Sequence, residues 1–519
     1  MIGFVVAYMA PLMFAGLIVF MVIGYPASFS LAAVGLFFGL IAIELGVIPS
    51  NFMGNLTYQL FSVLSNELLL AIPFFTFMGV ILERCGLAED LLEGFGQLFG
   101  GLRGGLSYAV ILVGAILGAI TGTVAASVIA MGLISLPIML KYGYNVRHAT
   151  GVIAASGTIT QLIPPSLVLI VLADQLGKSP GDMYIGATGA SIVQVLLFAA
   201  WVFILSIFRP HYIPALPPEA RTLRGWALAV KCFHGMVPSL ALIFVVLGTI
   251  FMGLATPTEA GAMGVVGAML LAKLYGRLSW SLVYQGMDVT MRLTAMVVFI
   301  LLGARVFSLV FQGVGGGHWI EGMLTGLPGG KVGFLIFSQI FVFLIAFFLD
   351  FFEIAFIIVP LLAPAATALG IDLIWFGVLL CVNMQTSFMH PPFGFALFYL
   401  RSIADSLFKT GALPKKVESR DIYLGAIPWV VMQLLLVLIV IFVPQTVTIF
   451  LDKPVVLDLK KASDDLQQMG GRLPDAPDAA APAASGTAAG AATAASAALP
   501  DDPMKAFEES SRRDAERKR

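Results

Sequence analysis

The chain has 519 residues, 59% of them apolar, and its 29 basic and 30 acidic side chains nearly cancel. Of these charges, 22 lie in the last 68 residues, from Asp452 on, so the first 451 residues carry only about 8% charged side chains. A soluble domain carries roughly 25%. This composition excludes a soluble enzyme, a nucleic-acid-binding protein and a disordered scaffold. It predicts an all-α polytopic membrane protein over the first 451 residues.

Eight stretches reach or approach the ~20 apolar residues that one membrane-crossing helix needs. Two others, Asn51–Asn66 and Tyr275–Thr290, are amphipathic and too polar to cross, so we expect them to lie along the membrane interface. The expected crossing segments are Ile2–Ile23, Ser28–Leu45, Leu68–Leu82, Ile185–Phe208, Met236–Leu254, Glu259–Leu274, Leu293–Phe311 and Ile427–Phe450.

Two further apolar regions are each too long for one span and are interrupted near the middle. Thr121-Gly122-Thr123 interrupts the first, and Asp350 with Glu353 interrupts the second. Each interruption predicts a re-entrant helical hairpin, and each hairpin is followed by a discontinuous helix that contains a Pro-Pro pair. The hairpins are expected over about residues 106–140 and 333–368, and the discontinuous helices over about 146–173 and 373–400.

Positive charge sets the orientation, because cytoplasmic loops are enriched in Lys and Arg. The basic segments Arg209–Lys231, Lys273–Arg292 and Arg401–Arg420 all fall in the cytoplasm if both hairpins enter and leave on one side. The resulting topology has ten crossings, two hairpins and both termini outside.

An internal repeat organises the chain. A shift of 227 residues places Pro137 on Pro364 and the pair Pro164-Pro165 on Pro391-Pro392. Each half has an odd number of crossings, so the halves are inverted, as in many secondary transporters. We expect a first repeat at 1–208, a cytoplasmic linker at 209–232, a second repeat at 233–451, and a disordered, dispensable Ala/Pro-rich tail at 452–519.

The interruptions carry the candidate binding groups, because unwound backbone carbonyls and hydroxyl or amide oxygens suit a weakly held cation such as sodium. Helix N-termini at the same breaks suit an anion. For any single hydroxyl, a bond to its own helix backbone is the alternative. The sodium-site candidates are Thr121, Gly122, Thr123, Ser156, Gly157, Thr160, Pro164, Asp350, Asn383, Thr386, Ser387 and Pro391.

Substrate contacts are expected from Arg305, Gln161, Gln385 and Asp350. Arg305 lies inside an apolar span, where its guanidinium could hold a carboxylate through two hydrogen bonds. A structural ion pair of Arg305 with Asp350 or Glu353 is an equally weighted alternative.

Several motifs in unbroken order resemble the large, DctM-like membrane subunit of tripartite ATP-independent periplasmic (TRAP) transporters. The resemblance spans roughly residues 1–450. Its residues are Ile72-Pro73-Phe74-Phe75 with Met78-Gly79 and Glu83-Arg84, Ala154-Ala155-Ser156-Gly157-Thr158, Ile163-Pro164-Pro165-Ser166, Thr256-Pro257-Thr258-Glu259-Ala260, and Asn383 with Pro391-Pro392.

This resemblance implies an inverted-repeat, elevator-type transporter in the bacterial inner membrane, driven by sodium ions and importing an organic acid. Its implied partners are a separate small four-helix membrane subunit (DctQ-like) and a periplasmic substrate-binding protein (DctP-like), with no role for nucleic acid. A self-sufficient sodium/carboxylate symporter or exchanger of similar build is the alternative. An integral-membrane enzyme is disfavoured, because the sequence shows no nucleophile or metal motif.

Overall fold

The structure, a computed structural model, describes residues 2–223, 225–390 and 394–451. Within these ranges every regular element is a helix, which confirms the all-α fold class. Pro391 and the charged tail from Asp452 on lie outside the described residues, and so does the side chain of Thr121. Seven described helices are long and apolar enough to cross a membrane, or nine if two bent helix pairs each count as one span. The expected ten crossings stay a prediction, because helix length alone does not place the membrane.

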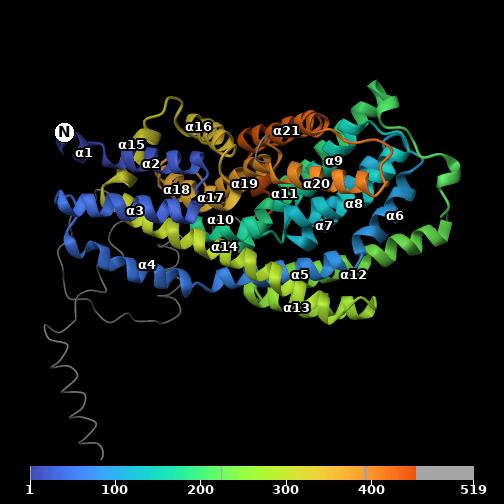
Figure 1. Cartoon of the computed structure of the whole chain (residues 1–519), viewed down its shortest axis with the longest axis horizontal. Helices are drawn as coiled ribbons and strands as arrows, with labels where there is room; N and C mark the ends of the chain where they lie inside the picture. Colours follow the sequence, from blue (N-terminus) through green and yellow to red (C-terminus); the bar gives the residue numbers. More distant parts are fainter. Residues whose placement is uncertain (1, 224, 391–393, 452–519) are drawn as a thin grey trace, which may run out of the picture. The chain divides into compact units, whose positions relative to one another are not determined.

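Several helices of the N-terminal and central parts of the chain pack together along one side of the fold. In Figure 1, α5, α12, α13 and α14 run side by side there, and α3 packs along α14. The helices of the N-terminal part are α1 (Ile2–Ala7), α2 (Met9–Ile23), α3 (Ala27–Glu44), η1 (Ser50–Gly54), α4 (Asn55–Leu64), η2 (Glu67–Leu70), α5 (Ala71–Arg84) and α6 (Leu87–Phe99). The central ones are α11 (Pro180–Phe208), η4 (Pro210–Tyr212), η5 (Pro218–Ala220), α12 (Gly225–Phe251), α13 (Pro257–Leu274), α14 (Trp280–Gly313) and α15 (Gly316–Thr325).

One long helix replaces two elements that the sequence predicts separately. We expected an interfacial segment over Tyr275–Thr290 and a distinct span from Leu293, but α14 runs unbroken through 34 residues. At 1.5 Å per residue this helix is about 51 Å long, far more than the ~30 Å hydrocarbon core. No proline or glycine stands between Gly286 and Gly303, so nothing ends the helix where the polarity changes.

The two hairpins and the two interrupted helices form where the sequence predicts them. Each hairpin joins two helices through a short tip, at Gly122-Thr123 in the first and 346–350 in the second. The first-half elements are α7 (Gly105–Thr121), α8 (Val124–Lys141), α9 (Val146–Thr158), η3 (Ile159–Gln161) and α10 (Leu167–Leu176). The second-half elements are α16 (Gly330–Ile345), α17 (Phe351–Glu353), the π-helical turn η6 (Ile354–Ile358), α18 (Val359–Ala368), α19 (Leu373–Met384), η7 (Gln385–Met389) and α20 (Phe395–Lys409), followed by α21 (Ser419–Phe442) and α22 (Gln445–Thr448).

The repeat is visible in the helix boundaries. α9 and α19 begin 227 residues apart, at Val146 and Leu373, and both are capped by the preceding side chain. The Asn145 side chain accepts from the Arg147 and His148 N–H groups, and the equivalent Asp372 accepts from Trp375 N–H. The two halves therefore place their interrupted helices by the same local chemistry.

Candidate functional site

A cavity of about 210 Å³ lies where the tip of the first hairpin meets the second hairpin and both interrupted helices. Four residues singled out in the sequence come together in its wall: Gly122, Thr123, Gln161 and Asp350. The cavity therefore joins segments far apart in the chain at the two predicted interruptions. The other lining residues are Val124, Ala125, Leu167, Val168, Leu293, Met296, Phe351, Phe352, Phe388, Phe395 and Tyr399.

Most of this wall is made of residues that are equivalent in the repeat. Five pairs of lining residues stand 227 positions apart: Thr123 and Asp350, Val124 and Phe351, Ala125 and Phe352, Gln161 and Phe388, and Val168 and Phe395. In four of these pairs the second half contributes a phenylalanine where the first half has an aliphatic or amide side chain. The two walls are therefore equivalent in backbone position and unequal in chemistry.

Four helices begin at this cavity, since the first residues of α8, α10, α17 and α20 all line it. Ser166 caps α10 by accepting from Val168 N–H at 3.2 Å, and Asp350 caps α17. Within the described ranges, α8 and α20 have no side-chain cap at Thr123 or Gly394. A helix N-terminus carries unpaired N–H groups and partial positive charge, so this arrangement favours an anion in the cavity.

The two acids at the second tip bind each other's backbone. Asp350 N–H donates to Glu353 Oε2 at 3.0 Å, and Glu353 N–H donates to Asp350 Oδ1 at 2.8 Å. Arg305, on α14, forms no ion pair with any described residue, and its Nε has no hydrogen-bond partner among them. Its guanidinium does not line the cavity either. The expected structural pair of Arg305 with either acid is absent from the described structure, and its contact with substrate stays a prediction.

Ser156 and Asn383 occupy equivalent repeat positions, and each has an unused oxygen in the core. Both residues are at most 1% exposed. The Asn383 amide nitrogen donates to the Gln339 carbonyl at 2.7 Å and to Gln339 Oε1 at 3.0 Å. Ser156 Oγ and Asn383 Oδ1 have no hydrogen-bond partner among the described residues. A buried polar oxygen without a partner is costly, so these two atoms fit a pair of cation ligands.

The remaining hydroxyl candidates mostly bond to their own helices. Thr160 Oγ1 donates to the Gly157 carbonyl oxygen. Thr386 Oγ1 donates to the Asn383 carbonyl, and Ser387 Oγ donates to the Met384 carbonyl, each at 2.7 Å. These are the local bonds that the sequence left open as an alternative, although each hydroxyl keeps lone pairs that can face a cation. Pro164 forms a cis peptide bond with Pro165 at the break itself.

Gln385 does not reach the cavity. Its side chain forms two hydrogen bonds with Gln194 of α11. Gln194 Nε2 donates to Gln385 Oε1 at 2.7 Å, and Gln385 Nε2 donates to Gln194 Oε1 at 3.2 Å. Both amides are fully buried. This reciprocal pair ties the second interrupted helix to α11, and a substrate contact from Gln385 is not part of the described arrangement.

The sequence interpretation missed how closely α7 lies on the first interrupted helix. A Cβ at Gly114 would come within 2.7 Å of Ser156 Cβ, and one at Gly118 within 2.9 Å of Thr160 Cα. The signal was present as a small-xxx-small spacing, Gly114 and Gly118, in an apolar helix. α7 therefore forms the back wall of the Ser156 position.

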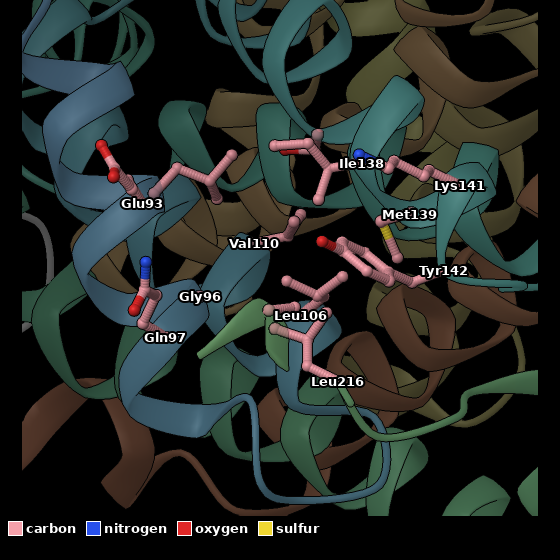
Figure 2. A pocket seen from close by; sticks show the side chains of 13 residues that line it. Glu93, Gly96, Gln97, Leu106, Val110, Ile138, Met139, Lys141, Tyr142 and Leu216 are labelled. Carbon is pink, nitrogen blue, oxygen red and sulfur yellow. The ribbon is translucent and has the colours of Figure 1, made fainter. Parts of the chain in front are cut away.

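A second cavity, of about 190 Å³, lies at the far ends of the first hairpin, between α6, the start of α7 and the end of α8. Figure 2 shows Tyr142 facing the side chains of α6 across this space. Gln97 of α6 binds the segment just before α12, accepting from Leu223 N–H at 2.7 Å and donating to Thr222 at 3.2 Å. This cavity belongs to the hairpin base and not to the site at the tips.

Two hairpins and two interrupted helices that meet around a cavity define the class: a multi-pass secondary transporter. The family model for the "Tripartite ATP-independent periplasmic transporter, DctM component" matches residues 14–446. The chain belongs to this family. It is the large permease subunit of a TRAP transporter, located in the bacterial inner membrane, and not an enzyme.

Curated relatives agree with this assignment. The C4-dicarboxylate TRAP transporter large permease protein of Pseudomonas aeruginosa is 30% identical over 392 residues, covering 75% of this chain and 87% of that protein. The ectoine/5-hydroxyectoine large permease protein of Ruegeria pomeroyi is 28% identical over 439 residues, covering 84% and 97%. The crystal structure of the Alcanivorax borkumensis YdaH transporter has a TM-score of 0.53 at 16% identity, covers 76% of this chain and 87% of that one, and supports the fold.

Proposed function

We propose that this permease imports an organic acid by sodium-driven elevator transport. The substrate is delivered by a periplasmic binding protein, and a small four-helix membrane subunit completes the complex. The observation that carries the proposal is the cavity at the hairpin tips, where four helix N-termini converge on a space of about 210 Å³. Such a cavity stabilises a carboxylate without a dedicated basic side chain.

Sodium ions bind, in this proposal, to two oxygens at equivalent repeat positions. Ser156 Oγ and Asn383 Oδ1 are buried and lack a hydrogen-bond partner among the described residues. They stand five residues before Gln161 and Phe388, the lining residues of the two interrupted helices. Ions bound there would add positive charge near the substrate carboxylate and strengthen its binding.

Reconstituted uptake tests the proposal. The permease is placed in proteoliposomes with its small subunit and binding protein, and uptake of the binding protein's ligand is followed. Replacing sodium by choline should abolish uptake, and Ser156→Ala and Asn383→Ala should each raise the sodium concentration needed for half-maximal rate.

The matched control is Ser239→Ala, since Ser239 is also a fully buried serine, on α12, and among the described residues it bonds only to the Gly235 carbonyl. Its sodium requirement should equal that of the unaltered protein. Uptake that proceeds equally in choline would refute the sodium coupling, and uptake without the binding protein would favour a self-sufficient symporter.

A further inference from the structure

All the described aromatic side chains that line the cavity at the hairpin tips come from the second half of the chain, and we call them its aromatic wall. Phe351 and Phe352 come from the second hairpin, and their ring centroids lie 4.1 Å apart. Phe388 and Phe395 come from the second interrupted helix, with ring centroids 6.3 Å apart. Tyr399, one turn further along α20, completes this wall. Tilted ring pairs of this kind offer a large apolar contact surface with defined geometry.

The same cavity has little to hold charge beyond its helix ends. Within the described part of the chain, its polar lining side chains are Thr123, Gln161, Asp350 and Tyr399, whose ring also belongs to the aromatic wall, and no Lys, Arg or His lines it. Asp350 is itself an acid, and its Oδ1 already accepts a hydrogen bond from the Glu353 N–H. One carboxylate can be placed at the helix N-termini, but a second would have no basic side chain to pair with and would lie against phenylalanine rings or beside Asp350, with only the neutral Gln161 and Tyr399 side chains as donors. A buried charge without a partner is strongly unfavourable.

We propose that the transported solute is a monocarboxylate with an aromatic body, and that this cavity discriminates against small dicarboxylates. The carboxylate meets the uncapped starts of α8 and α20, while the ring packs on the aromatic wall. The inference rests on the proposed function, in that the cavity is taken as the transport site. The proposed substrate differs from the C4-dicarboxylates for which several relatives are named.

Cysteine protection tests this inference in the full chain, and the chain offers matched pairs of positions. Phe395 and Phe398 lie on the same helix with 46% and 48% of their surface exposed, and only Phe395 lines the cavity. On α14, which also lines the cavity, Met296 is a lining residue at 44% exposure, and Phe299 at 52% is not. The native cysteines Cys85, Cys232 and Cys381 are buried and can be replaced by alanine to give a clean background.

The four single-cysteine variants, at Phe395, Phe398, Met296 and Phe299, are reconstituted in liposomes with sodium. Labelling by a maleimide is timed with phenylacetate or succinate as the probe. Phenylacetate should slow labelling at Phe395→Cys and Met296→Cys by a factor of 1 + [L]/Kd, about tenfold at ten times the Kd. Labelling of the other two variants should change by less than about twofold, and succinate should protect none of the four.

Protection by succinate equal to that by phenylacetate would overturn the inference, as would protection by neither probe. Equal protection of Phe398→Cys and Phe395→Cys would also overturn it, because the effect would then not be local to the cavity. Two reporters on different helices keep the test valid if one variant fails to fold. Loss of sodium dependence in the uptake assay would refute the proposed function and leave this binding result unaffected.

Discussion

A single methyl group added to α7, on the face that packs against Ser156, tests whether Ser156 binds sodium. Gly114→Ala places a Cβ at 2.7 Å from Ser156 Cβ and 2.9 Å from the Ser156 carbonyl oxygen. Carbon atoms in contact prefer about 3.5–4.0 Å, so α7 and α9 must separate by roughly 1 Å, because one of the opposing atoms is backbone and cannot rotate away. Overpacking of this kind costs about 1–3 kcal/mol, against a gain of about 0.5–1 kcal/mol from removing a mid-helix glycine.

We therefore expect Gly114→Ala to lower the free energy of unfolding by about 1–2 kcal/mol and to raise the sodium concentration at which sodium stabilises the protein. Thermal unfolding of detergent-solubilised protein across a sodium titration measures both effects, since a bound ion stabilises the folded state by mass action. Gly248→Ala is the control: it lies in the last turn of α12 with nothing within 4 Å of the new Cβ, so it should be neutral or slightly stabilising. A Gly114→Ala protein that titrates with sodium like the Gly248→Ala control would show that Ser156 does not bind the ion.

Two other predictions concern residues expected to meet the substrate. Gln194→Leu leaves the buried Gln385 amide without its hydrogen-bond partner and should lower the free energy of unfolding by about 1–3 kcal/mol. The double variant Gln194→Leu/Gln385→Leu should recover most of this loss and keep uptake. A double variant that is stable but does not transport would instead place Gln385 at the substrate. Arg305→Lys keeps the charge but loses the planar donor fork, so if Arg305 holds the substrate carboxylate, uptake should fall at least about tenfold with little change in melting temperature. Parallel losses of uptake and stability would assign Arg305 a structural role.

The interruptions were predictable because they break a local rule. Thr121-Gly122-Thr123, Asp350 and the Pro164-Pro165 pair each place polar or helix-breaking residues inside an apolar run, and the structure has a break between two helices at each of them. The start of α9 was predictable for the same reason, since Asn145 is a strong N-cap. Helix breaks and caps of this kind depend on a few consecutive residues, so they can be predicted from a single sequence.

Contacts between distant elements were not predictable in this way. The Gln194–Gln385 pair joins side chains 191 residues apart, and nothing in the neighbourhood of either residue indicates its partner. The placement of Arg305 away from the acids is a property of how α14 packs, which its own sequence does not specify. The unbroken course of α14 was missed because polarity was taken to end a helix, whereas only backbone geometry or packing does so.

The equivalence of the two halves links the ion ligands to the substrate cavity. Ser156 lies near the end of α9, and the short 3₁₀ turn that follows ends at Gln161, which lines the cavity. Asn383 lies near the end of α19, and its 3₁₀ turn carries Phe388 into the same cavity. A 3₁₀ turn is held by weaker hydrogen-bond geometry than an α-helix and is readily reordered. An ion that engages either oxygen therefore acts on the turn that sets a cavity wall, and sodium and solute should stabilise one another's binding by the same factor.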